Sequence, residues 1–171
     1  MNLEKESQII GQWHSYYVPV KVKKLDPRAI IPKYQKDGDA GFDFYALLEE
    51  GLEYIKVEPY CQKIINTGIS CTIPVGYEIQ IRPRSGLALR YEITITNSPG
   101  TIDSGFIIPN EIKIIIKNLS INKAFVIKNG DRIAQGVLSA VPMAIFEEVE
   151  EVEEKDRNRD RNGGFGSTGI S

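Results

Sequence analysis

Hydrophobic and polar residues alternate over short stretches along most of the chain. The alternation is clearest in residues 18–22, 77–82 and 112–117. Shorter runs rich in β-branched residues lie at 63–73, 93–96, 124–128 and 133–138. Glycine and proline separate these runs. A period of two with frequent turn residues is typical of many short strands, so the sequence predicts an all-β sandwich or barrel.

The first 17 residues follow a different pattern. Their hydrophobic residues have helix-like spacing and are Ile9, Ile10, Trp13, Tyr16 and Tyr17. This spacing predicts a short helix that packs on the domain. We therefore expect an N-terminal extension at 1–17, followed by a β-barrel domain at 18–146.

The hydrophobic pattern stops after Phe146. Residues 147–161 are mostly charged, and residues 163–169 hold four glycines around Phe165. Neither part can bury enough apolar surface to order alone. We therefore predict that residues 147–171 form a flexible arm that orders over a ligand. Glycine would allow close approach of the backbone, and Phe165 would offer a stacking face.

Composition narrows the class of function. The 171 residues suffice for one domain with a core, and the formal net charge of −2 argues against a general nucleic-acid binder. No apolar run approaches the roughly 20 residues needed to span a membrane, and the charged start lacks a signal-peptide pattern. Cys61 and Cys71 are interpreted as free thiols rather than a disulfide, so we expect a cytoplasmic protein.

Histidine is almost absent, and His14 is the only one in the chain. A Ser-His-Asp or Cys-His mechanism and a His/Cys zinc site are therefore disfavoured. If the protein is an enzyme, its general base should be a carboxylate.

Two segments in the first half of the domain interrupt the strand pattern with residues suited to chemistry. In DAGFDFYA, Asp39–Ala46, Gly41 allows close backbone approach and Asp43 could hold a cation or its waters. The alternative is a turn that enters a strand. In RPRSGLALR, Arg82–Arg90, three arginines surround Ser85, and arginine matches phosphate oxygens. With no histidine nearby, Ser85 is interpreted as a phosphate ligand; the alternative is a surface loop.

Two later segments add a base and a second polar group. In NSPGTIDSGF, Asn97–Phe106, the amide of Asn97 suits one base edge and Phe106 could cover a sugar. Asp103 is the single acid of this segment and the best candidate base, although a hairpin with a capping aspartate would look alike. Gln135 lies inside an apolar run, where a buried amide needs partners that neighbouring strands could also supply.

Together with the terminal GGFGSTG, these segments resemble, in order and spacing, the five motifs of the trimeric dUTPases (dUTP diphosphatases). The likeness runs from about Val18 to Gly169. It implies a jelly-roll-like distorted β-barrel in a homotrimer whose active sites are shared between chains. It also implies hydrolysis of dUTP to dUMP and pyrophosphate with Mg²⁺, which would remove dUTP from the nucleotide pool and supply dUMP for dTMP synthesis.

The resemblance also implies a role for each matching residue. Asp103 matches the aspartate that activates the attacking water, and Phe106 stands where most members carry a tyrosine that stacks on deoxyribose. Mg²⁺ would be held mainly by the substrate phosphates, with Asp43 and Gln135 reaching it indirectly through water. The substrate-binding residues implied within the barrel are Arg84, Ser85, Gly86, Asn97, Gly100, Thr101, Ile102, Phe106 and Gln135.

The arm would complete the site. Phe165 matches the aromatic residue that lies over uracil. Gly166, Ser167 and Thr168 match the segment that closes on the phosphates, and either Arg161, which we favour, or Arg159 would serve the arm's arginine. The chain departs from the family pattern after Phe106, where IIPNEI looks like a two-residue insertion.

Two alternative functions remain at this level. The first is a dCTP deaminase or a bifunctional dCTP deaminase–dUTPase, because GTIDSGF resembles that family too. Its chemistry uses a glutamate in the following strand, whereas IKIIIKN here has no acid and Glu111 lies ahead of it. The second is a non-catalytic trimer that binds a nucleotide or a protein partner. The joint presence of Asp103, Ser85, Gln135 and Phe165 argues against it.

Overall fold

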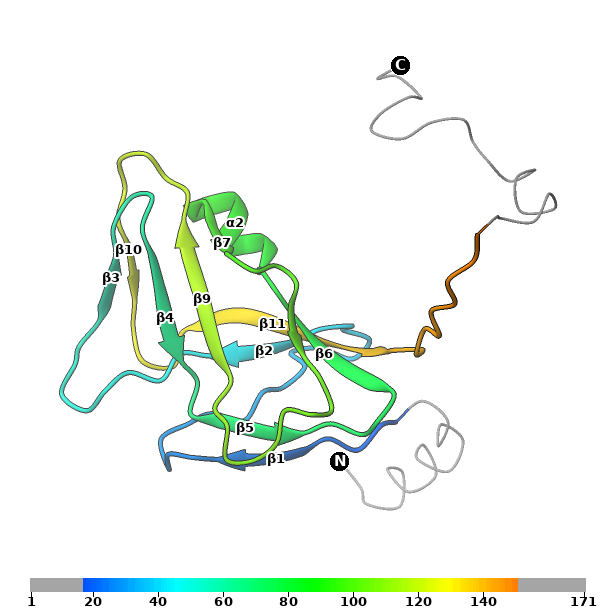
Figure 1. The fold of residues 1–171 in the computed structure, drawn as a ribbon. Coiled ribbons are helices and arrows are strands. Elements are labelled where there is room, and N and C mark those ends of the chain that lie inside the picture. The colour runs from blue at the N-terminus through cyan, green and yellow to red at the C-terminus, as the bar shows by residue number, and fades with distance from the viewer. Residues whose placement is uncertain (1–16, 151–171) are drawn as a thin grey trace.

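The computed structural model describes residues 17–150. Within them the chain forms short strands and a single short helix, α2 (Ser85–Tyr91), as Figure 1 shows. The strands are β1 (Lys21–Lys24), β2 (Phe42–Tyr45), β3 (Ile55–Val57), β4 (Gln62–Asn66), β5 (Ile69–Thr72), β6 (Tyr77–Arg82), β7 (Ile93–Ile95), β8 (Gly100–Ile102), β9 (Lys113–Asn118), β10 (Phe125–Ile127) and β11 (Arg132–Ala140).

The strands form two larger sheets and two ribbons, and all pairs are antiparallel. The four-stranded sheet has the order β2-β11-β6-β8, and the three-stranded sheet has the order β4-β9-β7. The ribbons are β1-β5 and β10-β3. In Figure 1 the β1–β5 ribbon lies below β2 and β11, and β3 and β10 stand at the far left.

Strand β9 illustrates why alternation produces these elements. Ile114 and Ile116 are 1% and 0% exposed, whereas Lys113 between Ile112 and Ile114 is exposed. Buried side chains from different sheets belong to one core, including Phe44 of β2 in the four-stranded sheet and Ile114 of β9 in the three-stranded sheet. Burial of these faces is the main stabilising contribution, at about 25 cal/mol per Å² of apolar surface.

Helix α2 does not follow from the alternation of hydrophobic and polar residues. It begins after Arg84, whose backbone is extended, and ends at Glu92, which adopts the left-handed conformation at φ 56°. None of its residues is buried, so it carries no full apolar stripe that would reveal a helical period. Arg90 in the last turn interacts favourably with the helix C-terminus.

The segment after the last strand leaves the body of the domain, as the orange trace in Figure 1 shows. The backbone N–H of Val141 still donates to Gly76, but Met143, Ile145 and Phe146 are 86%, 96% and 94% exposed. This chain therefore leaves a run of large apolar side chains uncovered. The predicted helix at the N-terminus falls, except for the exposed Tyr17, outside the described residues.

Both cysteines are free thiols. Cys61 is exposed and Cys71 is buried, and burial raises the pKa of the Cys71 thiol to about 11. Over residues 17–150, no helix is long and apolar enough to cross a membrane.

Candidate active site

Three of the segments singled out in the sequence meet in one row across the four-stranded sheet. Gln135 of β11 pairs with Asp43 of β2 on one side and with Arg82 of β6 on the other. Residues that face one another across neighbouring strands project from the same face of a sheet. Strand pairing therefore places the motif residues of β2 and β11 beside the loop that follows β6.

A buried carboxylate links this row to the loop before helix α2. Asp43 is 7% exposed. Its Oδ1 lies 3.0 Å from Nε of Arg84, and its Oδ2 accepts a hydrogen bond of 3.1 Å from Nη1 of Arg132. Arg84 in turn donates from Nη1 to the backbone carbonyl of Arg132 at 2.9 Å. One carboxylate thus neutralises part of the charge of two arginines.

Gln135 fixes the other side of the loop. Its Nε2 donates a hydrogen bond of 2.8 Å to the carbonyl of Pro83. Its Oε1 points at Gly41, where a Cβ atom would lie 2.8 Å from that oxygen. Gly41 is therefore required for close approach of the backbone to the glutamine. The expected partners of this amide are supplied by a neighbouring loop rather than by its own strand pairs.

These side chains surround an open cavity of about 540 Å³. Ser85 and Gly86 contribute from the first turn of α2, where backbone N–H groups have no partner within a helix. The lining residues from the predicted site are Asp43, Arg84, Ser85, Gly86 and Gln135; the lining also includes Arg132 and Lys36. Arginine, hydroxyl and backbone N–H donors around one hollow suit an oligophosphate.

The hairpin at 97–106 carries the remaining predicted residues of the barrel domain. Gly100 opens strand β8 and is buried, and a Cβ there would lie 3.1 Å from Nδ2 of Asn97. Asp103 is exposed just after the strand, and its Oδ1 accepts a 2.8 Å hydrogen bond from the backbone N–H of Gly105. Phe106 is half-buried against the core. Thr101 is exposed and Ile102 is half-buried.

The Asp103 end of the hairpin lies apart from the cavity within one chain. Ile102 pairs with Ile79 of β6, whereas Gln135 pairs with Arg82. These β6 positions are three residues apart, which is roughly 10 Å along a strand. The cavity around Ser85, and the adjoining hollow that reaches Ser98 and Pro99, include neither Asp103 nor Phe106 in their linings.

The donors at the cavity fit one kind of Mg²⁺ site. Within residues 17–150, no three His, Cys, Asp or Glu side chains gather as a metal-binding cluster. Both oxygens of Asp43 already face arginines, and Gln135 offers only an amide oxygen. Mg²⁺ commonly keeps several waters and binds through substrate phosphates. The residues present therefore fit an ion delivered by the phosphates and not a protein cage.

Several predicted residues are not placed. Arg161, Phe165, Gly166, Ser167 and Thr168 fall outside the described residues. The sequence reading also missed Arg132, which lines the cavity and contacts Asp43. The signal was present in GDRIAQ, where a basic residue stands three positions before Gln135, but only the glutamine was singled out.

Comparison with known proteins decides the family. A model of the dUTPase family matches residues 27–169. The chain belongs to the dUTPase family. Among curated relatives, deoxyuridine 5'-triphosphate nucleotidohydrolase of Helicobacter pylori is 45% identical over 152 residues, covering 89% of this chain and 97% of the relative. The enzyme of that name from Syntrophotalea carbinolica is 47% identical over 153 residues, covering 90% and 98%.

Solved dUTPase structures have the same fold. A Staphylococcus bacteriophage 80alpha dUTPase variant with dUpNHpp superimposes with a TM-score of 0.74 at 26% identity, covering 89% of this chain and 99% of that one. A dUTPase variant from phage phi11 of S. aureus, described as coordinating a structural Mg(II) ion, gives 0.69 at 25% identity, covering 80% and 99%. The predicted all-β, jelly-roll-like fold and the resemblance to dUTPases are confirmed, and the chain is an enzyme of this family.

Proposed function

We propose that this chain hydrolyses dUTP to dUMP and pyrophosphate. The observation that carries the proposal is the cavity in which Arg84, Ser85, Gly86 and Gln135 converge in a chain of the dUTPase family. The test is a phosphate-release assay coupled to pyrophosphatase, run across all the deoxynucleoside triphosphates. Turnover of dUTP alone is expected. Equal turnover of all of them would contradict the proposed base selectivity.

Asp103 is the proposed general base. Its Oδ1 is fixed by the N–H of Gly105, so the carboxylate has a defined direction, and its exposure leaves it open to a water molecule. The carboxylate would take a proton from the water that attacks the α-phosphorus. The donors of the cavity would hold the triphosphate in line and offset its charge as pyrophosphate leaves.

Base and sugar recognition are proposed for the hairpin. Asn97 and the backbone groups of Gly100, Thr101 and Ile102 would read uracil, because an amide and backbone groups present both donors and acceptors. The Asn97 side chain lies so close to Gly100 that a Cβ there would be 3.1 Å from its Nδ2, which supports a narrow pocket. Such a pocket would exclude the methyl group of thymine. Phe106 would pack on deoxyribose and reject a ribose 2′-OH.

Mg²⁺ is the proposed cofactor. The ion would neutralise charge on the triphosphate and orient it. Gln135 would act on its hydration shell, and Asp43 would act indirectly, through waters or by ordering the site, while Arg84 and Ser85 would contact the phosphate oxygens directly.

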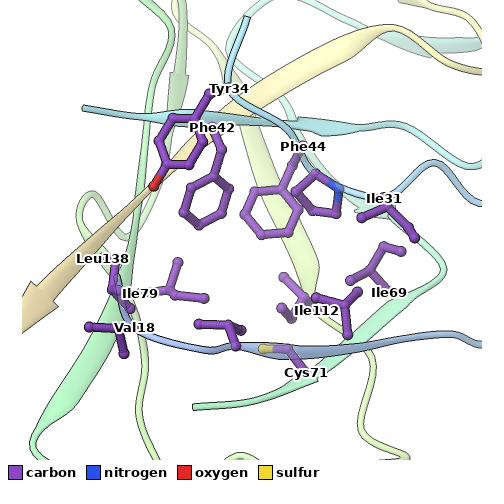
Figure 2. A pocket seen from close by; sticks show the side chains of 13 residues that line it. Val18, Ile31, Tyr34, Phe42, Phe44, Ile69, Cys71, Ile79, Ile112 and Leu138 are labelled. Atoms are coloured by element: carbon purple, nitrogen blue, oxygen red, sulfur yellow. The ribbon is translucent and has the colours of Figure 1, made fainter. Parts of the chain in front are cut away.

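We further propose a homotrimer in which each active site draws on different chains. Two observations support association. Asp103 and the phosphate cavity lie apart within one chain, and Met143, Ile145 and Phe146 are left uncovered. An apolar cavity of about 340 Å³ also opens between β1 and the four-stranded sheet; Figure 2 shows Val18, Tyr34, Phe42 and Leu138 around it. Contact between copies would cover such surfaces. Light scattering should give three times 19.2 kDa.

The C-terminal arm is proposed to close over the bound nucleotide. Phe165 would stack on uracil, Gly166, Ser167 and Thr168 would meet the phosphates, and Arg161 would reach the γ-phosphate. Removing residues 162–171 should leave the thermal melt of the ligand-free protein almost unchanged and should reduce turnover severely. Unfolding of the truncated protein would instead make the arm structural. A larger loss for Arg159→Ala than for Arg161→Ala would reassign the arginine.

In the cell, the activity would keep dUTP low and supply dUMP, and we place it in the cytoplasm. The deaminase alternative requires a free glutamate near the Asp103 segment. Glu111 instead accepts a 2.8 Å hydrogen bond from the N–H of Gly68 and lies 3.7 Å from Lys113. Incubation with dCTP and assay of released ammonia separates the two activities, and ammonia release would overturn the assignment.

A further inference from the structure

The apolar cavity between β1 and the four-stranded sheet shares no lining residue with the cavity around Ser85. We propose that it is a docking site for the N-terminal segment of the same chain, residues 1–16, and that Trp13 enters it with one of its apolar neighbours. This segment lies ahead of the part that matches the dUTPase family, which begins at residue 27. The proposal therefore goes beyond the nucleotide chemistry and does not depend on it.

The cavity is open and apolar. Its volume is about 340 Å³, and none of the thirteen described residues that line it is charged. Ile31 and Tyr34 are each 52% exposed, and Figure 2 shows both beside the hollow. Tyr34 stands edge-on to Phe42, with ring centroids 5.5 Å apart, so the rim includes an aromatic wall. Since a cavity of about 150 Å³ accepts a benzene ring, this one has room for an indole and an aliphatic side chain.

The N-terminal segment joins the domain at this rim. The described chain begins at Tyr17, which is 63% exposed, and the next residue, Val18, already lines the cavity. Val20 and Val22 line it too. Trp13 stands five positions before Val18, a span of about 7.5 Å along a helix or about 17 Å along an extended chain. Trp13 can therefore reach the cavity in either conformation, and the short tether gives it a high effective concentration there.

The sequence of this segment supplies a face that fits the cavity. At 3.6 residues per turn, its large apolar residues fall within an arc of about 120° on one side of a helix. They are Ile9, Ile10, Trp13, Tyr16 and Tyr17. The residues between them, which fall outside that arc, are Gly11, Gln12, His14 and Ser15. A helix this short is marginal in water, so it would form only where the apolar face is buried.

Charge favours this segment over the other candidate occupant, residues 143–146 of a second copy. Glu147 and Glu148 directly follow that run, so its entry would bring carboxylates to an apolar rim, which is costly. Residues 7–17 contain no Asp, Glu, Lys or Arg. In the proposed trimer, a neighbouring copy that contacts this face would pack on the docked segment rather than on the bare cavity.

The fluorescence of Trp13 tests the proposal directly, because it is the only tryptophan of the chain. The measurement is quenching by acrylamide in the full chain, both folded and unfolded in urea. We expect several-fold weaker quenching in the folded chain, together with a blue-shifted emission, because the indole would lie in apolar surroundings. Equal quenching in the two states would overturn the proposal and leave the cavity to residues 143–146 of another copy.

A matched pair of substitutions locates the docking site. Ile31 at the rim and Ile121, which lies between β9 and β10 and outside the cavity, are 52% and 70% exposed, so aspartate at either position does not open the core. Ile31→Asp should restore most of the quenching of the unfolded chain, because it places a charge in the apolar site. Ile121→Asp should leave Trp13 protected. Protection that survives Ile31→Asp, or that is lost equally in both variants, would overturn the assignment to this cavity. Tyr34→Ser is a second rim variant with the same expectation, should Ile31→Asp not fold.

Mixed assemblies distinguish a segment that docks on its own chain from one that is exchanged between copies. Ile31→Asp chains keep Trp13 but lack a competent cavity, whereas Trp13→Phe chains keep the cavity and carry no tryptophan. After both are unfolded and refolded together, Trp13 should remain as quenchable as in Ile31→Asp chains alone. Recovered protection would mean that the segment enters the cavity of a neighbouring copy, and docking within one chain would be overturned.

Discussion

Around Asp43, two strands and the start of helix α2 are tied together by ion pairs and hydrogen bonds, whereas Asp103 stands exposed behind strand β8 with one backbone donor. The first region is complete within a single chain, because Asp43, Arg84 and Gln135 contact their partners directly. In the second region, the carboxylate of Asp103 is exposed and accepts a hydrogen bond only from the backbone N–H of Gly105 among the described residues. The difference indicates that the cavity around Asp43 is preorganised in the fold, and it supports the proposal that the Asp103 half of the site is completed by another chain.

The largest expected effect on turnover concerns Asp103, the exposed carboxylate after strand β8. Asp103→Asn keeps the shape of the side chain and its acceptor for the Gly105 N–H, but removes the proton-accepting carboxylate. Turnover of dUTP should fall at least about a hundredfold, the usual scale for loss of a general base. Binding of dUTP and the thermal melt should be retained. Near-normal turnover would assign the base to another residue.

Mixing two inactive variants tests whether the two halves of each site come from different chains. Asp103→Asn chains and Arg84→Gln chains each lack one half of the site. In randomly mixed trimers with each site built from two different chains, about a quarter of the sites would have both halves intact. Activity should therefore return after denaturation and refolding of the mixture. If both halves come from the same chain, every site remains defective and no activity returns.

The strand pattern predicts most of the fold because burial of one strand face is a local property of the sequence. Ile112, Ile114 and Ile116 are recognisable in this way and are buried. Helix α2 is not recognisable from such a pattern, because none of its residues is buried. The predicted barrel domain ends at Phe146; β11, the last strand, ends at Ala140, and Met143, Ile145 and Phe146 beyond it are exposed.

The sequence predicts some residues of the candidate site and misses others, for a related reason. Asp103 is the single acid of its segment and Gln135 lies inside an apolar run, so each stands out along the chain. Arg132 does not, because an arginine near a turn is ordinarily a solvated surface residue. Its contact with Asp43 joins residues 89 positions apart and depends on the pairing of β2 with β11. Only the folded chain reveals such a partner.

A smaller effect on turnover is expected when the region around Gln135 is crowded by a substitution at Gly41. Gly41→Ala would place a Cβ 2.8 Å from Oε1 of Gln135, the mobile end of a flexible side chain. The glutamine can rotate away, so we expect a stability change within about 0.5 kcal/mol, the range of substitutions that disturb neither the core nor the backbone. Rotation would break the hydrogen bond to Pro83 and lower kcat about tenfold, the scale for one misplaced polar contact.

The control for this substitution is the same change in a chain that lacks the amide. In a Gln135→Ala background, Gly41→Ala should cause no additional loss of kcat, because the crowded atom is gone. An additional tenfold loss would mean that Gly41 serves the substrate or the backbone directly. A large drop in melting temperature for Gly41→Ala alone would show that the region cannot adjust.

The smallest expected change concerns the selectivity between deoxyribose and ribose, which we assign to Phe106 in the hairpin. Phe106 is half-buried against the core, so one face of its side chain remains accessible. Phe106→Tyr keeps that face and should leave kcat/KM for dUTP nearly unchanged. Phe106→Ala removes it and should reduce the preference for dUTP over UTP several-fold, on the scale of one lost apolar contact. The measurement is kcat/KM for both nucleotides with each variant. Because Phe106→Ala also removes packing against the core, its melting temperature must be compared with that of Phe106→Tyr. Equal selectivity of a folded alanine variant and the unsubstituted chain would show that Phe106 does not cover the sugar, and recognition of deoxyribose would then belong to a residue from another chain or from the arm.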